Sequence, residues 1–222
     1  PVIAQDWQAA THTPLFEAYG MSECSTFIST NPSEPVAASA LGRPQPGRRV
    51  AILGPDGQPT AFDTPGTIAI HRRDPGLMIG YLDAPDETAA RFAGDWFLTG
   101  DQGQMSPDGQ ITYLGRADDM MNAGGYRVSP LEVEQALAGA PGIEALAVTQ
   151  IEVKADVFII VAFYTAATEQ PESQLKDFAA KRLASYKCPR AYLHVSHLPT
   201  GPNGKLARRA LTGLWRGSDD QT

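Results

Sequence analysis

Five short clusters of glycine, polar and charged residues are the parts of this 222-residue chain whose side-chain types can do chemistry. In chain order they are Tyr19-Gly20-Met21-Ser22-Glu23, Thr99-Gly100-Asp101, Gly115-Arg116-Ala117-Asp118-Asp119, Gly124-Gly125-Tyr126-Arg127-Val128 and Gly204-Lys205. Carboxylates bind hard divalent cations, basic side chains bind phosphate, and glycines let a backbone approach a ligand closely. Any single cluster is a weak indication of a functional site, because Gly-Asp and Gly-Arg pairs also occur in ordinary turns. The five clusters together, in this order, are a strong indication of one.

This order of clusters resembles the C-terminal portion of an adenylate-forming enzyme, in the superfamily of acyl-CoA synthetases, luciferases and peptide-synthetase adenylation domains. The resemblance extends from about Phe16 to Leu211. It implies an AMP-forming acyl-CoA ligase, in which ATP and a small carboxylic acid give an acyl-adenylate and the thiol of coenzyme A then displaces AMP. The implied cofactors are ATP, Mg²⁺ and coenzyme A.

The resemblance implies a nucleotide site made of Tyr19, Gly20, Ser22, Asp101 and Arg116. Tyr19 would lie against the adenine, and the Ser22 hydroxyl would touch the α-phosphate. The two oxygens of Asp101 suit the vicinal diol of a ribose, because each can accept one O–H. Arg116 would lie near the ribose and phosphate. Glu23 is the implied Mg²⁺ ligand, since a hard divalent cation prefers carboxylate and phosphate oxygens.

Two further clusters are implied to act in the thioester-forming step. Asp118 resembles the hinge residue about which a small C-terminal domain rotates between the two half-reactions. Gly124, Gly125, Tyr126 and Arg127 resemble the loop that lies along the tunnel for the thiol arm of coenzyme A. Gly125 has no Cβ to obstruct that arm, and Arg127 is placed to meet a phosphate.

Lys205 matches the catalytic lysine of the superfamily's terminal motif. The first half-reaction joins a carboxylate to an α-phosphate, and these two anions repel each other. An ammonium group that contacts both offsets this repulsion and stabilises the transition state, by a few kcal/mol in comparable charge contacts (roughly 3 to 4). Lys205 is therefore expected to act in adenylation.

Composition bounds the class of protein. The net charge of −7 comes from 25 acidic and 18 basic residues without a block of like charge, so nothing indicates a nucleic-acid partner. The two cysteines, Cys24 and Cys188, have no metal-ligand spacing and favour a reducing, cytoplasmic location. No apolar run reaches the roughly 18 residues needed to span a membrane.

The expected fold class is α+β, with a small distorted β-barrel-like lobe followed by a compact mobile domain. Residues 1–116 read as short strands between Gly/Pro turns, such as the Asp56-Gly57 turn after the strand at 50–53. They correspond to the C-terminal lobe of a large adenylating domain. Residues 117–215 would form the small domain, and 216–222 a tail.

Helices and strands alternate in the second part. Ser129 is predicted to cap a helix that begins at Pro130, with Glu132 three residues after the cap. The apolar run 157–163 predicts a central strand, residues 172–186 predict a helix, and 192–198 predict a last strand.

Members of the superfamily carry, upstream of the Tyr-Gly segment, a loop with a lysine that wraps the ATP phosphates. Only 18 residues precede Tyr19. The chain is therefore expected to be a fragment that lacks an N-terminal half and to form no acyl-adenylate by itself.

Two other functions stay open. The first is a peptide-synthetase adenylation domain that loads a carrier protein. The second is a nucleotide-binding or interaction module without catalysis, which ATP binding to the chain would test. The sequence does not identify the carboxylic acid.

Overall fold

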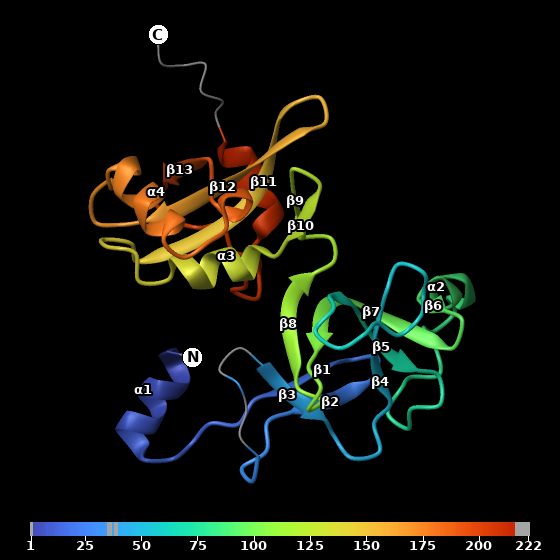
Figure 1. Ribbon diagram of the computed structural model, residues 1–222. Coiled ribbons are helices and arrows are strands. Elements are labelled where there is room, and N and C mark those ends of the chain that lie inside the picture. The colour runs from blue at the N-terminus through green and yellow to red at the C-terminus, as the bar shows by residue number, and fades with distance from the viewer. Residues whose placement is uncertain (1, 35–36, 38–39, 216–222) are drawn as a thin grey trace. The chain divides into compact units, whose positions relative to one another are not determined.

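The computed structural model describes residues 2–34, 37 and 40–215, and the predicted tail at 216–222 lies outside these described residues (Figure 1). The chain divides between Ala117 and Asp118 into two compact units. Among the described residues, no helix is long and apolar enough to cross a membrane.

The first unit is built on one antiparallel sheet. Its strands run in the order β1-β2-β3-β8-β7-β5-β4, and β6 pairs with β7. The elements are α1 (Val2–Thr11), β1 (Ala18–Met21), β2 (Ser25–Ser29), β3 (Ala40–Pro44), β4 (Val50–Leu53), β5 (Gly66–His71), α2 (Pro85–Ala90), β6 (Phe92–Ala93), β7 (Trp96–Met105) and β8 (Ile111–Arg116).

The predicted barrel is wrong for the part of the chain that the structure describes. The sheet there is an open path that ends at β1 and at β4, with no pairing between these two end strands. Short strands with evenly spaced turns are common to barrels and to open sheets, and closure depends on a pairing between distant strands. The mixed α+β class is confirmed.

Burial alternates along β7 with the period of two that a strand imposes. Phe97, Thr99 and Asp101 therefore face the same, buried side. Phe97 joins an apolar core with Phe27 and Ile28 of β2, and with further residues of the sheet and its turns: Cys24, Ile52, Ile68, Ile70 and Ile111. Asp101 is thus held at the edge of an apolar core.

The second unit has a hairpin, a three-stranded sheet and short helices. The sheet order is β11-β12-β13, with β11 antiparallel and β13 parallel to β12. The elements are β9 (Met121–Ala123), β10 (Tyr126–Val128), α3 (Pro130–Leu137), β11 (Ala145–Lys154), β12 (Val157–Thr165), α4 (Glu172–Ala180), η1 (Ser185–Lys187), β13 (Ala191–His194) and η2 (Arg208–Leu214).

Both faces of this sheet are covered. On one face, Val148 and Ile160 pack with residues of α3, α4 and the β9–β10 hairpin. On the other, Val161 and Phe163 pack with Leu211 of η2. The uninterrupted apolar run of β12 is explained by burial on both sides, and its predicted central position is confirmed (Figure 1).

The predicted start of α3 is also confirmed. The Ser129 Oγ accepts a hydrogen bond of 3.2 Å from the Glu132 N–H, and Pro130 is the first helical residue. The helix predicted for 172–186 is shorter, because α4 ends at Ala180. Ala184 is extended, and the chain leaves the helix so that Leu183 packs on the core beneath α3 and α4.

Candidate functional site

The first unit brings together Tyr19, Asp101 and Arg116, which are distant in sequence. Asp101 and Arg116 are opposite each other in the β7–β8 register, and the Arg116 guanidinium donates to Asp101 Oδ1 at 3.1 Å. The Tyr19 hydroxyl donates to Asp101 Oδ2. Since β2, β3 and β8 separate β1 from β7 in the sheet, this contact requires the sheet to curve over itself.

Local backbone geometry allows the contact between Arg116 and β7. Gly100 has φ +81°, a region that side chains rarely adopt, and a Cβ there would lie 3.0 Å from the Arg116 guanidinium. The Thr99 hydroxyl accepts the Asp101 N–H at 3.1 Å and donates to the Ile68 carbonyl at 2.7 Å. The Asp101 side chain is therefore fixed from its own strand and from the neighbouring one.

The Asp101 carboxylate is well supplied with donors. Besides Tyr19 and Arg116, the Tyr113 hydroxyl lies 3.4 Å from Asp101 Oδ1. A carboxylate offers about four lone-pair sites, so three protein donors leave about one. A ribose diol, which brings two hydroxyls, would have to replace one of these donors, and the long Tyr113 contact is the weakest.

Tyr19 acts as a stable hydrogen-bond donor. Burial, and then the adjacent Asp101 carboxylate, raise the pKa of the Tyr19 phenol well above its usual range. Its ring contacts Phe27 edge-on, with the ring centres 5.2 Å apart, and is tilted against Tyr113. The predicted contact with adenine stays a prediction.

Ser22 and Glu23 form the turn between β1 and β2. Gly20 is needed just before this turn, because a Cβ there would lie 2.3 Å from the Ser25 carbonyl oxygen. Ser22 is exposed, and Glu23 Oε1 accepts a hydrogen bond of 2.8 Å from the Tyr81 hydroxyl. The turn thus presents the Ser22 hydroxyl and the Glu23 carboxylate, and Tyr81 holds one oxygen of that carboxylate.

Glu23 fits a magnesium ion that arrives with a nucleotide. Among the described residues, no three His, Cys, Asp or Glu side chains gather into a metal-binding group. Mg²⁺ commonly takes only one or two carboxylates from the protein and its other ligands from substrate phosphates and water. A single carboxylate beside a predicted phosphate position is such a donor set.

The sequence did not point to the residues that support this turn. The Arg48 guanidinium donates to the carbonyls of Cys24 and Thr26 at 2.6 Å each and pairs with Asp74 at 3.0 Å. The Asp74 side chain is fully buried. Its burial acts to raise its pKa, but the N–H groups of Arg49 and Gly76 and the Arg48 charge outweigh this and lower the pKa. No local motif joins residues 24, 48 and 74, so no pattern in the sequence reveals the network.

We expect Asp74→Asn to lower the free energy of unfolding of the first unit by about 3 kcal/mol at pH 7, because it leaves the Arg48 charge buried without its counter-ion. The folded pKa of Asp74 is lowered, so its contribution is present above the unfolded pKa of about 4 and is lost as the pH falls through the folded value. The deficit of the variant should therefore shrink in acid. Hydrogen exchange of the β5 and β7 amides measures it.

Asp95→Asn is the matched control, because Asp95 pairs with Arg72 at 3.4 Å on the surface, where both side chains are exposed. It should change stability by less than about 0.5 kcal/mol. A deficit for Asp74→Asn that stays constant from pH 7 to pH 3 would contradict the assigned role of the Asp74 charge.

The predicted hinge and thiol-arm loop lie in the second unit. Asp118 Oδ2 accepts a hydrogen bond of 2.7 Å from Arg209. Gly124 and Gly125 have φ +60° and +87°, and a Cβ on either would meet nothing within 4 Å. The Tyr126 ring lies 4.6 Å from the Tyr186 ring, measured between ring centres. The loop is therefore open to solvent, with glycine required by its φ angles.

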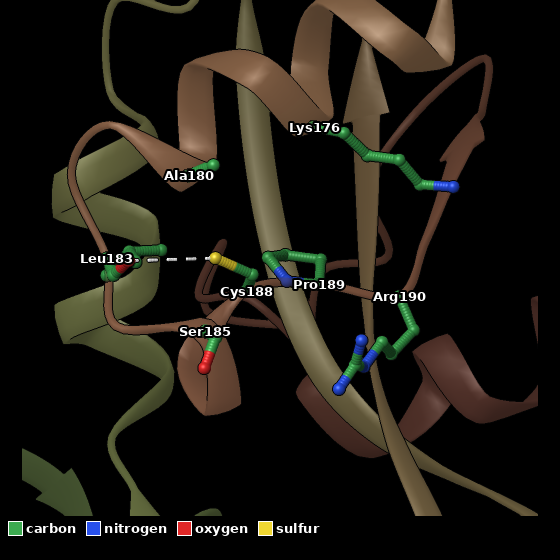
Figure 2. A pocket seen from close by; sticks show the side chains of 7 residues that line it. All are labelled: Lys176, Ala180, Leu183, Ser185, Cys188, Pro189 and Arg190. Atoms are coloured by element: carbon green, nitrogen blue, oxygen red, sulfur yellow. Dashed lines mark hydrogen bonds between the residues drawn. The ribbon is translucent and has the colours of Figure 1, made fainter.

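A cavity of about 150 Å³ adjoins this loop, lined in part by Gly124, Tyr126, Tyr186 and Arg190. Arg190 also lines a neighbouring cavity of about 440 Å³, in which Lys176 lies on α4 and Cys188 follows η1 (Figure 2). Burial raises the pKa of the Cys188 thiol, which argues against a nucleophilic role. Figure 2 shows that Lys176 and Arg190 lie on one side of the pocket, and Ala180 and Leu183 on the other.

Lys205 lies near the end of a tight turn. The Gly201 N–H donates to the Lys205 carbonyl at 2.7 Å, and Thr200 and Leu206 form an isolated β-bridge. Lys205 itself is exposed. The turn thus presents the ammonium group outward from the second unit.

The chain matches two family models, described as AMP-binding enzyme over residues 1–82 and as AMP-binding enzyme C-terminal domain over residues 132–205. It is 32% identical to the human mitochondrial acyl-coenzyme A synthetase ACSM4, and the match includes 98% of this chain and 39% of that protein. The mouse mitochondrial acyl-coenzyme A synthetase ACSM3 is 30% identical over 95% of this chain and 38% of its own length. The chain therefore spans about two fifths of the length of the curated relatives it matches.

Two solved structures are similar over 95% of this chain. ATP-bound MatB from Rhodopseudomonas palustris superposes with a TM-score of 0.85 at 27% identity, and 42% of that chain is covered. The O-succinylbenzoate coenzyme A synthetase MenE from Bacillus subtilis, in complex with ATP and magnesium, gives a TM-score of 0.82 at 26% identity, with 44% covered.

Proposed function

Because the chain belongs to the family of AMP-binding enzymes that includes the acyl-CoA synthetases, we propose that it takes part in the ATP-dependent joining of a carboxylic acid to a thiol. It spans two fifths of its relatives, so the reaction is proposed for a protein of the relatives' length that contains it, called the full-length protein below. In the first step the carboxylate oxygen attacks the α-phosphorus of ATP, and pyrophosphate leaves. In the second step a thiolate attacks the acyl carbon, and AMP leaves.

The observation that carries this proposal is the contact network of Tyr19, Asp101 and Arg116. In it the Asp101 carboxylate, which would accept the ribose hydroxyls, contacts the Arg116 guanidinium, which would meet a phosphate. Both are fixed by the β7–β8 register. A site that binds a diol and a phosphate together is suited to a nucleotide.

Glu23 and Ser22 would face the phosphate end of the nucleotide. Tyr81 engages Glu23 Oε1, which orients the carboxylate. When bound there, Mg²⁺ would screen the phosphate charges and polarise the α-phosphorus. The Ser22 hydroxyl would donate to an α-phosphate oxygen.

Lys205 would contact the carboxylate and the α-phosphate in the first step. The open glycine loop at Gly124 and Gly125 would admit the thiol arm in the second step. Coenzyme A is the proposed thiol, and a carrier protein with a pantetheine arm is the alternative acceptor. The same loop suits both, because both bring the same arm.

Carboxylate-dependent ATP–pyrophosphate exchange by the full-length protein tests the first step, over a panel of aliphatic and aromatic acids. We expect exchange with at least one acid, and thioester formation with coenzyme A added. The 222-residue chain alone should show no exchange while still binding AMP. Thioester formation only with a carrier protein would support the alternative acceptor, and AMP binding without exchange by the full-length protein would leave a non-catalytic module.

A further inference from the structure

Arg208 lies three residues after Lys205 and is closely anchored to the second unit. Only 10% of its side chain is exposed. Its guanidinium pairs through both terminal nitrogens with Glu134 on α3, at 3.2 Å for one of them, and it also donates to the Val148 carbonyl on β11. Asp119 lies 3.7 Å from its Nε. One side chain therefore contacts a helix, a strand and the segment next to the predicted hinge.

Glu134 is held from two sides in this arrangement. Its Oε1 accepts the Val148 N–H at 2.8 Å as well as the Arg208 guanidinium. Only 15% of the Glu134 side chain is exposed. The charges of Arg208 and Glu134 compensate each other where little water reaches them. In such surroundings a charged group with a hydrogen-bonded counter-ion is strongly preferred to an unpaired one.

The turn that carries Lys205 has few anchors of its own. Its two ends are joined by the Ala207 N–H, which donates to the Pro199 carbonyl at 2.8 Å, and by the Thr200–Leu206 bridge. Within the turn, Gly201 to Lys205 pair only with each other among the contacts of the described residues. Leu198 and Leu206, on either side of the turn, pack on the apolar core around Leu211, and Arg208 is the first ion-paired anchor after the turn.

We propose that Arg208 is a positioning residue for Lys205. By fixing the end of the turn to α3 and β11 and to Asp119, it sets where the Lys205 ammonium lies relative to the hinge segment. This inference rests on the proposed function for the role of Lys205, but the anchoring itself does not. A misplacement of about 1 Å at a reacting group can cost on the order of 100-fold in rate, so this anchoring has a measurable consequence.

Arginine is required because of its planar fork. Two nitrogens meet the two Glu134 oxygens while the third faces Asp119. A lysine offers a single point charge and cannot make these contacts at once. Arg208→Lys therefore keeps the charge and removes the anchoring geometry, whereas Arg208→Met removes both.

Arg209→Met is the matched control. Arg209 is the next residue and also pairs with an aspartate, Asp118, but 80% of its side chain is exposed. Because exposed ion pairs contribute little to the free energy of folding, loss of the Arg209–Asp118 pair should have little effect. This variant removes a guanidinium from the same short helix, and it leaves the ion pair between Arg208 and Glu134 in place.

The first measurement is hydrogen exchange on the 222-residue chain. In Arg208→Met and Arg208→Lys, exchange of the amides of 199–207 should rise at least about tenfold, and by a larger factor than exchange of the β11 and β12 amides. Arg209→Met should change neither. Unchanged exchange at 199–207 would overturn the proposal, and so would an equal increase over the whole second unit in both Arg208 variants and in Glu134→Gln.

The second measurement is made on the full-length protein. Arg208→Lys should lower kcat for acyl-adenylate formation by about 10- to 100-fold with KM for ATP unchanged, since binding is left intact and only the reacting group moves. A change in KM alone would overturn the positioning role. If the parent protein forms no adenylate, the proposed function fails, while the exchange experiment still decides whether Arg208 anchors the turn.

Discussion

Lys205→Ala in the full-length protein is expected to lower the rate of acyl-adenylate formation by about 100- to 1000-fold, and to leave thioester formation from supplied acyl-adenylate within about twofold. Only the first step brings two anions together, so only that step needs the ammonium charge. The structure supports a chemical cause for this change, because Lys205 is exposed and its side chain has no partner among the described residues. Single-turnover assays of the two steps give the two rates.

Lys176→Ala is the control for this prediction. Lys176 is an exposed lysine of the same unit, whose charge pairs with Glu172 at 3.0 Å on the surface of α4. Its removal should change neither half-reaction by more than about twofold. Equal losses in both half-reactions for Lys205→Ala would remove Lys205 from the first step.

Asp118→Pro should suppress thioester formation by about 100-fold and leave adenylation nearly unchanged. Proline fixes φ near −65° and removes a backbone N–H, so a residue that must change its dihedral angles between two poses is held in one. The structure places Asp118 at the boundary of the two units. Transfer from preformed acyl-adenylate to coenzyme A, measured in a single turnover, is the test.

The ion pair of Asp118 with Arg209 must be separated from the backbone effect. Asp118→Ala removes the pair without restricting φ, and it should transfer at a rate within about threefold of the parent, because the pair is exposed.

Gly125→Leu should suppress thioester formation by a different cause. Gly125 has a φ of +87°, at which a leucine would be strained, and the leucine side chain would obstruct the thiol arm. Parent-like transfer by both Asp118→Pro and Gly125→Leu would show that residues 116–128 are an ordinary linker and turn.

Local patterns predicted the local structure well. The Ser129 cap, the proline that begins α3 and the central strand β12 were each predicted from a few neighbouring residues, and the structure confirms them. The length of α4 was wrong because Leu183 packs on the core from outside the helix, which is a tertiary effect. The open sheet was missed for the same reason, since strand order is decided between residues far apart.

The candidate site shows the same division. Its residue types were predicted, but the contacts between them depend on strand pairing: Asp101 meets Arg116 through the β7–β8 register and Tyr19 through the curvature of the sheet. Arg48 and Tyr81 lie outside the five clusters, and only the fold shows that they hold the Glu23 turn. The same is true of Arg208, which in the sequence is one of two adjacent arginines.

The donors around Asp101 also bear on turnover. With Tyr19, Arg116 and Tyr113 beside it, the carboxylate has three donors from the protein itself. In the proposed function a ribose would therefore exchange one set of hydrogen bonds for another, and its departure would leave no buried charge unpaired. Contacts of this kind would favour neither capture nor retention strongly, so in the proposed reaction they would let AMP leave after the thioester forms. Most of the binding free energy of the nucleotide would then come from contacts with its phosphates, which differ between ATP and AMP.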